Sequence, residues 1–254
     1  MTLLAAQLYT VRELCKTPAE VATACAKIKK MGYDGVQISG ICQMDPKEMR
    51  RILDGEGLAC PATHIGLPRI EGEVDAVIEE HKIIGCDHVA IGGFFPPEPW
   101  TKALWMDFID RYNVLCEKYA AAGITIGYHN HSHEFSPVEG RRPIDMLINL
   151  LDPRIWMEID TYWVAHGGAD PAAYIDKVAG RISRIHLKDL TMTPAREHKM
   201  CEIGDGNLNW PRILQSCRNS GVKWYIVERD SGDMEPFASL ERSIFNMKEK
   251  LGLF

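Results

Sequence analysis

A unit of one apolar run, one loop and one amphipathic segment recurs along the chain. Apolar runs of strand length fall at residues 3–9, 35–40, 59–65, 88–94, 125–131, 155–161, 182–188 and 223–229. After each run, apolar residues recur at intervals of three and four, as Phe237, Leu240, Ile244, Met247 and Leu251 do in the final segment. This spacing gives a helix one apolar face. The pattern therefore predicts eight β-strands, each followed by an α-helix.

Capping residues mark the borders of the predicted helices. Thr17-Pro18-Ala19-Glu20 and Asp45-Pro46-Lys47-Glu48 each supply a capping side chain, a proline at the first helical position and a glutamate at the third. Glycine stands just before several of the next strands, where a left-handed cap is easiest. Eight such units in 254 residues predict an α/β fold, a (β/α)₈ TIM barrel formed by a single domain over residues 1–254. A doubly wound sheet shares the alternation.

Polar side chains gather at the carboxyl ends of the predicted strands. Side chains alternate between the two faces of a strand, and in most runs one parity is apolar while the other turns polar toward its end. The polar set comprises Gln7, Gln37, His64, His129, His131, Asp160, His186 and Glu228. The active site of a barrel lies at this rim. Ionisable groups that converge there are costly to desolvate unless they are paired or bind a metal.

Three members of this set point to a metal centre. Asp160, His186 and Glu228 end three successive strands, so we expect them to face one another. Two carboxylates and an imidazole suit one divalent ion, Mn²⁺, Co²⁺, Mg²⁺ or Zn²⁺. A fourth ligand is expected from the fifth strand, where both His129 and Glu134 are candidates.

Composition narrows the class of protein. The chain is 46% hydrophobic with a formal net charge of −6, which disfavours a nucleic-acid partner. Its eight cysteines form no C-x-x-C pair, so a disulfide framework is not expected. No signal peptide and no apolar stretch of membrane-spanning length is evident, which predicts a soluble cytoplasmic protein that does not bind membranes.

Five motifs carry a resemblance to a known family. They are Tyr128-His129-Asn130-His131 with Glu134-Phe135, Glu158-Ile159-Asp160-Thr161-Tyr162-Trp163, Arg184-Ile185-His186-Leu187-Lys188-Asp189, Glu202-Ile203-Gly204-Asp205-Gly206 and Val227-Glu228-Arg229-Asp230. In this order they resemble the sugar phosphate isomerase/epimerase superfamily, the xylose isomerase-like TIM barrels that are also called the AP endonuclease family 2 fold. The resemblance spans essentially the whole chain.

The resemblance implies a divalent metal at the barrel mouth. Asp160, His186 and Glu228 match the family's ligands from strands six, seven and eight. The strand-five position departs from the common pattern, because many members carry a glutamate where this chain has His129, with Glu134 five residues later. Our sequence-based ligand set is Glu134, Asp160, His186 and Glu228, with His129 as the alternative to Glu134.

The implied reaction is that of an isomerase or epimerase acting on a small sugar or keto sugar. The metal binds the carbonyl and a neighbouring hydroxyl and stabilises an enediolate after a base removes the intervening proton. We expect Glu228 and Glu134 as bases, with His131 or His129 as their partner. The residues expected to contact the substrate are Gln7, His64, Trp163 and Lys188, although packing roles are open for His64 and Trp163.

Three other functions compete with this one. A hydro-lyase, similar to inosose dehydratases or to enzymes that eliminate from 3-keto sugars, would share the first half of the chemistry. A repair nuclease on the same fold would need a three-metal cluster, but Trp163 stands where a histidine ligand would be wanted. A sugar-binding protein without activity is the third. Similar enzymes pair into homodimers or tetramers, so a homo-oligomer is also an expectation.

Overall fold

Eight parallel strands form a closed barrel at the centre of the molecule. The computed structural model describes residues 2–253, so the ends of the predicted domain, Met1 and Phe254, lie outside the described residues. The barrel strands are β1 (Leu3–Gln7), β2 (Gly35–Gln37), β3 (Thr63–His64), β4 (His88–Ile91), β5 (Thr125–His129), β6 (Trp156–Glu158), β7 (Arg184–Leu187) and β10 (Trp224–Val227). They pair in the orders β2-β1-β10-β7 and β3-β4-β5-β6. Parallel bridges Ile38↔Thr63 and Asp160↔His186 join the two sheets.

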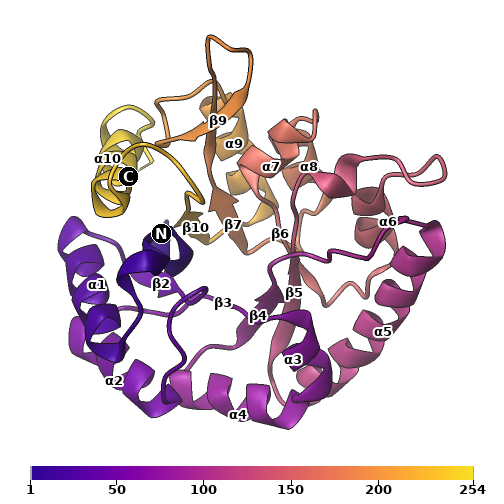
Figure 1. Cartoon of the computed structure of the whole chain (residues 1–254), viewed down its shortest axis with the longest axis horizontal. Coiled ribbons are helices and arrows are strands. Elements are labelled where there is room, and N and C mark those ends of the chain that lie inside the picture. Colours follow the sequence, from indigo (N-terminus) through magenta and orange to yellow (C-terminus); the bar gives the residue numbers. More distant parts are fainter. Residues whose placement is uncertain (1, 254) are drawn as a thin grey trace.

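Helices surround the barrel, which confirms the predicted (β/α)₈ architecture (Figure 1). They are α1 (Pro18–Met31), α2 (Pro46–Glu56), α3 (Leu67–Gly72), α4 (Val74–Ile84), α5 (Lys102–Ala121), α6 (Pro143–Leu150), α7 (Thr161–His166), α8 (Pro171–Lys177), α9 (Trp210–Ser220) and α10 (Pro236–Glu249), with short 3₁₀ turns η1 (Leu8–Leu14) and η2 (His133–Phe135). Thr17 and Glu20 form the predicted capping box of α1. The apolar stripe of α10 is buried against the barrel at Leu240, Ile244 and Met247.

The strands are shorter than the apolar runs that predict them. In the third run, residues 59–65, only Thr63 and His64 form a regular β-strand, because Pro61 has no N–H to donate to a neighbouring strand. In the first and sixth runs the chain leaves the barrel early, since Gln7 caps η1 and Asp160 caps α7. The strand ends therefore lie close to the rim where the polar side chains gather.

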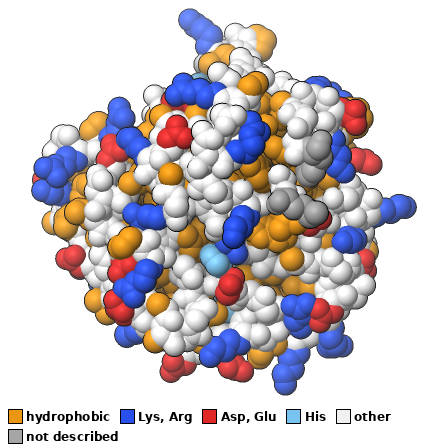
Figure 2. Space-filling view, turned by 180° about the vertical axis from the view of Figure 1, so that it is seen from behind, with side chains coloured by type: hydrophobic (Ala, Val, Ile, Leu, Met, Phe, Trp, Pro, Cys, Tyr) orange, Lys and Arg blue, Asp and Glu red, His pale blue; other side chains and the backbone are white. Residues whose placement is uncertain are grey.

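An antiparallel hairpin follows β7 and was not predicted. It consists of β8 (Asp189–Met192) and β9 (His198–Cys201) and projects from the rim (Figure 1). Its apolar side chains Leu190 and Met200 pack against Tyr162 in a small cluster separate from the main core. Seen from behind, the surface carries basic and acidic side chains interspersed around the barrel (Figure 2). No helix within residues 2–253 has both the length and the apolar character to cross a membrane.

Candidate metal centre and active site

Four buried side chains from four neighbouring barrel segments converge at the rim. They are His129 at the end of β5, Asp160 after β6, His186 in β7 and Glu228 after β10, and one ligand atom from each lies within 4.8 Å of the others. Asp160 is oriented by its place at the start of α7, where its Oδ1 accepts a hydrogen bond from the Trp163 amide at 2.9 Å. The other carboxylate oxygen of Asp160, Oδ2, therefore faces the other three side chains.

The chemistry of these four residues fits a divalent metal. His129 Nδ1 is buried without a hydrogen-bond partner. His186 Nδ1 and Glu228 Oε2 lie 2.8 Å apart without the alignment of a hydrogen bond, and Glu228 Oε2 also pairs with the Lys188 ammonium. Two imidazoles and two carboxylates are a donor set that Mn²⁺, Co²⁺ or Zn²⁺ accepts more readily than the oxygen-seeking Mg²⁺.

A second layer of polar residues fixes the orientation of His186. His186 Nε2 lies 2.6 Å from Gln37 Oε1, and Gln37 Nε2 donates to Glu158 Oε1 at 3.0 Å. His64 Nε2 contacts Glu158 Oε2 at 2.5 Å. Because Nε2 of His186 is taken by Gln37, its Nδ1 faces the four-residue group. Outer partners of this kind orient ligands in metal sites.

The buried charges compensate one another. Burial disfavours a charged His186, but the adjacent Glu158 and Glu228 raise its pKa to about 10. Burial lowers the pKa of His129 to about 4, with His186 adding to the effect. A metal bound here would have to displace the proton of His186, as metal ligands must be deprotonated.

Lys188, between β7 and β8, brings a cation to the same place. Its Nζ lies 3.2 Å from Asp160 Oδ2, 2.7 Å from Glu228 Oε2 and 2.9 Å from Asp230 Oδ1. Burial disfavours its charge, but these three carboxylates outweigh burial and hold the pKa of Lys188 well above its usual range. The ammonium is therefore charged at neutral pH.

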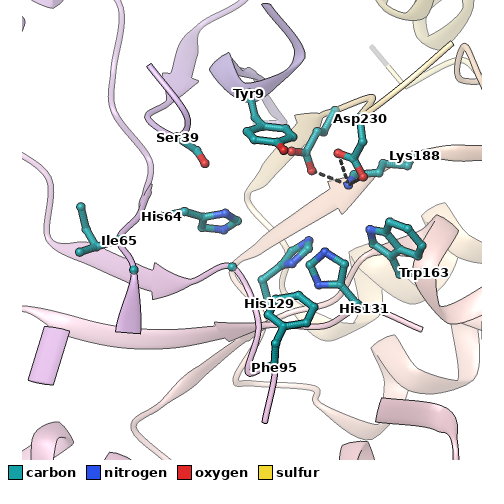
Figure 3. Close-up of a pocket in the computed structure, with 13 residues that line it drawn as sticks. Tyr9, Ser39, His64, Ile65, Phe95, His129, His131, Trp163, Lys188 and Asp230 are labelled. Carbon is teal, nitrogen blue, oxygen red and sulfur yellow. Dashed lines mark hydrogen bonds and ion pairs between the residues drawn. The ribbon is translucent and has the colours of Figure 1, made fainter. Parts of the chain in front are cut away.

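A cavity of about 490 Å³ opens above these groups. Figure 3 shows Lys188 and Asp230 joined on one side of it, with His64, His129 and His131 facing them. Trp163 and the 64% exposed Phe95 flank His131. His131 Nδ1 and Trp163 Nε1 are buried without a protein partner. These atoms can bind hydroxyl groups of a ligand, which is the chemistry that a polyhydroxylated substrate requires.

Glu134, one of the predicted ligands, lies outside the four-residue group and does not line the cavity. Its carboxylate accepts hydrogen bonds from the Tyr128 hydroxyl at 2.7 Å and from the His131 amide at 2.9 Å. Burial raises the pKa of Glu134 to about 7. The structure thus brings His129, the alternative candidate, into the group and places Glu134 behind the loop that carries His131.

The other predicted residues divide between the cavity and the barrel interior. His64, His131, Trp163, Lys188 and Glu228 line the cavity. Gln7 does not, because it is fully buried in β1, where its Oε1 accepts from the Tyr9 amide. Burial, followed by the charges of His129 and Lys188, lowers the pKa of His131 to about 2, so this histidine is neutral.

Sequence reasoning missed Glu158, Asp230, Tyr9 and Phe95 as site residues. Glu158 shares the strand parity of Asp160, and Asp230 follows Glu228 by two residues, so the alternation along strands carried a signal for both. Tyr9 lies in η1, at the parity of Gln7 in the first apolar run, and Phe95 lies in the loop after β4; both line the cavity. No periodic pattern marks a loop position such as Phe95.

Sequence comparisons support the same family of barrels. A family model described as xylose isomerase-like TIM barrel matches residues 25–249. The rhizopine catabolism protein MocC of Rhizobium meliloti is 25% identical over 84% of this chain and 75% of its own length. An inosose dehydratase of Clostridium beijerinckii is 27% identical over 72% of this chain, and the match spans 62% of that protein.

Solved structures share the fold at lower identity. A sugar phosphate isomerase/epimerase from Parabacteroides distasonis superimposes with a TM-score of 0.83 at 22% identity, covering 98% of both chains. An IOLI protein solved with a bound zinc atom has a TM-score of 0.77 at 12% identity, over 100% of this chain and 99% of that one. These neighbours share the barrel with the present chain.

Proposed function

Because the chain belongs to the xylose isomerase-like TIM barrel family, we propose that it is a metal-dependent hydro-lyase acting on an uncharged keto sugar or inosose. The observation that carries the proposal is the four-residue group of His129, Asp160, His186 and Glu228 at the base of a cavity that also holds Lys188. When bound by these four residues, a divalent ion supplies Lewis-acid polarisation of a substrate carbonyl.

Glu228 is the residue proposed to take the proton next to the carbonyl. It belongs to the four-residue group and also lines the cavity, whereas Asp160 and His186 lie beneath the lining. The pKa of Glu228 lies well below its usual range, because Lys188 and His186 outweigh the effect of burial. Glu228 is therefore ionised at neutral pH, as a general base must be.

The position of Lys188 supports elimination. Its Nζ is 2.7 Å from Glu228 Oε2, so a base and a protonated amine approach a bound substrate from one side. Glu228 would take the C–H proton while Lys188 gives a proton to the departing β-hydroxyl, so that water leaves and a carbon–carbon double bond forms. A proton passed back between these two neighbours restores both groups. The inosose dehydratase relatives support the same reaction class.

Epimerisation, the first expectation from the sequence, is our second candidate. It requires proton-carrying groups on opposite faces of the substrate, and His131 lines the cavity away from Lys188 and Asp230 (Figure 3). The strand-five position, which would supply a second carboxylate in many family members, is His129 here. This difference favours elimination over epimerisation.

The charge of the cavity favours an uncharged substrate. Among the described residues that line it, Lys188 is the only lysine or arginine, and it is already paired with Asp160, Glu228 and Asp230. A phosphate group would face these carboxylates without a free cation. A neutral polyol can instead use the unpartnered Trp163 Nε1 and His131 Nδ1.

The test is a screen of unphosphorylated keto sugars and inososes with Mn²⁺- or Co²⁺-loaded protein in D₂O. We expect exchange of the hydrogen next to the carbonyl, seen by NMR, together with an unsaturated product that absorbs in the ultraviolet. Exchange without that product would favour epimerisation. If none of the compounds in the panel shows hydrogen exchange or an unsaturated product, the proposal is contradicted.

Two glutamate variants make the screen specific. Glu228→Gln keeps the shape of the side chain but removes both the proposed base and one proposed metal ligand, so at saturating Mn²⁺ the exchange rate should fall at least about 100-fold. Glu241→Gln, on the exposed face of α10, makes the same chemical change away from the cavity and should leave the rate unchanged. Equal rates in both variants would exclude Glu228 as the base.

A further inference from the structure

The ammonium of Lys188 occupies the same carboxylate oxygens that the metal would need. Its Nζ lies 3.2 Å from Asp160 Oδ2 and 2.7 Å from Glu228 Oε2. Both residues belong to the four-residue group. Lys188 is only 2% exposed, so the ammonium cannot retreat into bulk water. Two cations that share these oxygens repel each other strongly in a site of low dielectric constant.

Asp230 gives the ammonium a third carboxylate partner, outside the four-residue group. Lys188 Nζ lies 2.9 Å from both Oδ1 and Oδ2 of Asp230, which is not one of the four converging residues. Asp230 lies at the edge of the cavity with 23% of its side chain exposed, on the side of Lys188 (Figure 3). Its backbone is held in place, because Arg12 Nη2 donates to the Asp230 carbonyl at 3.0 Å.

We propose that Asp230 is a positioning residue that holds the Lys188 ammonium beside Glu228 when a divalent metal takes over the oxygens of Asp160 and Glu228 that Lys188 now contacts. Asp230 then holds the ammonium beside the cavity, where Lys188 meets the substrate oxygens. The inference rests on the proposed function in one respect, namely that the four-residue group binds a metal. Asp230 itself neither binds the metal nor transfers a proton in this scheme.

The direct test measures the affinity of the substrate-free protein for Mn²⁺, with free Mn²⁺ followed by electron paramagnetic resonance. Asp230→Asn leaves Lys188 with Asp160 and Glu228 as its only carboxylate partners, so Mn²⁺ should bind at least about tenfold more weakly than to the wild type. Asp233→Asn removes the same charge from an exposed neighbour that pairs with Lys199, and its affinity should match the wild type. Asp230→Glu should bind Mn²⁺ within about threefold of the wild type, because the carboxylate is retained.

A double-mutant cycle separates the effect on Lys188 from a direct effect of the Asp230 charge on the metal. Lys188→Met removes the competing ammonium, so it should bind Mn²⁺ more tightly than the wild type. In that background Asp230→Asn should change the affinity by less than about threefold. An equal loss in both backgrounds would overturn the inference, because Asp230 would then act on the metal directly.

The remaining outcomes distinguish this inference from the proposed function. If the wild type binds Mn²⁺ and Asp230→Asn binds it equally well, the inference fails and the proposed metal site stands. If the wild type binds neither Mn²⁺ nor Co²⁺, both fail together. If Lys188→Met does not fold, the comparison of Asp230→Asn with Asp233→Asn and Asp230→Glu decides the matter.

Discussion

At the scale of single residues, Glu134 shows how burial and hydrogen bonding set the behaviour of a carboxyl group. The side chain is fully buried and its two oxygens accept from Tyr128 and from the His131 backbone. These bonds stabilise the carboxylate, yet burial outweighs them and raises the pKa of Glu134 from 4.5 to about 7. Glu134 therefore anchors the loop that carries His131 and titrates near neutrality.

This raised pKa predicts a pH-dependent contribution to stability. The folded state binds the Glu134 proton more tightly than the unfolded state, so the stabilisation is fully present below about pH 4.5 and is lost as the pH rises through about 7. Its upper limit is about 3 kcal/mol. In metal-free protein, the free energy of unfolding of the wild type relative to Glu134→Gln should fall over this range.

The measurement is chemical unfolding at several pH values. Glu79→Gln, exposed on α4, is the matched control, and its free energy of unfolding should follow the wild type at every pH. If the free energy of unfolding of Glu134→Gln has the same pH dependence as that of the wild type, the pKa of Glu134 is not raised.

Strand endings made part of the site predictable at the residue scale. Asp160, His186 and Glu228 could be placed together because parallel barrel strands end at one rim. Glu134 could not be placed, since its position depends on the path of η2 and on the hydrogen bond from Tyr128. Asp230 could not be identified from the sequence, because its role depends on the contact between the Lys188 side chain and the segment after β10.

At the scale of elements, the segment after the β8–β9 hairpin wraps around one buried carboxylate. Asp189 Oδ2 accepts from the Gly204 and Gly206 amides at 2.8 and 3.1 Å and from Trp210 Nε1 at 2.7 Å. The Gly204-Asp205-Gly206 segment therefore holds Asp189, the neighbour of Lys188, and does not line the cavity. Its glycines permit this close approach of the backbone.

The tight wrapping predicts a steric cost at Gly206. A Cβ atom there would lie 2.6 Å from the Leu190 carbonyl oxygen and would clash with the Asp189 carboxylate. Gly206→Ala should therefore destabilise the fold by about 1–3 kcal/mol, as crowding a packed site does. Gly55→Ala in α2, where a Cβ meets nothing within 4 Å, should be neutral or stabilising by up to about 1 kcal/mol. Thermal unfolding of both variants checks this, and a Gly206→Ala protein as stable as the wild type would contradict it.

Elements with strong local signals were predictable, whereas the hairpin was not. The helix borders follow from caps such as Thr17 with Glu20, whose interactions are local. The third strand is shorter than its apolar run, because Pro61 interrupts the hydrogen-bond ladder with the neighbouring strand. The hydrophobic pattern alone does not show this local effect. The two hairpin strands are only four residues long, and their apolar side chains Leu190 and Met200 pack against Tyr162, which is distant in sequence.

At the scale of the whole molecule, barrel closure creates the site. His129, Asp160, His186 and Glu228 come from β5 and the segments that end β6, β7 and β10, and no two of them are close in sequence. The bridge between Asp160 and His186 joins the two sheets at the point where the ligand groups meet. The closed barrel therefore aligns the donors before any metal binds, which is the preorganisation that a metal site requires.

We propose that these four residues, with His129 and without Glu134, hold one divalent metal. The most direct test is the metal content of protein purified without chelators, incubated with Mn²⁺ or Co²⁺ and then dialysed. We predict about one ion per chain in the wild type and in Glu134→Gln, and none in Asp160→Asn or His129→Ala, because three ligands bind a metal much more weakly than four. A wild type without metal, or an Asp160→Asn protein that retains a full ion per chain, would contradict this assignment of the metal ligands.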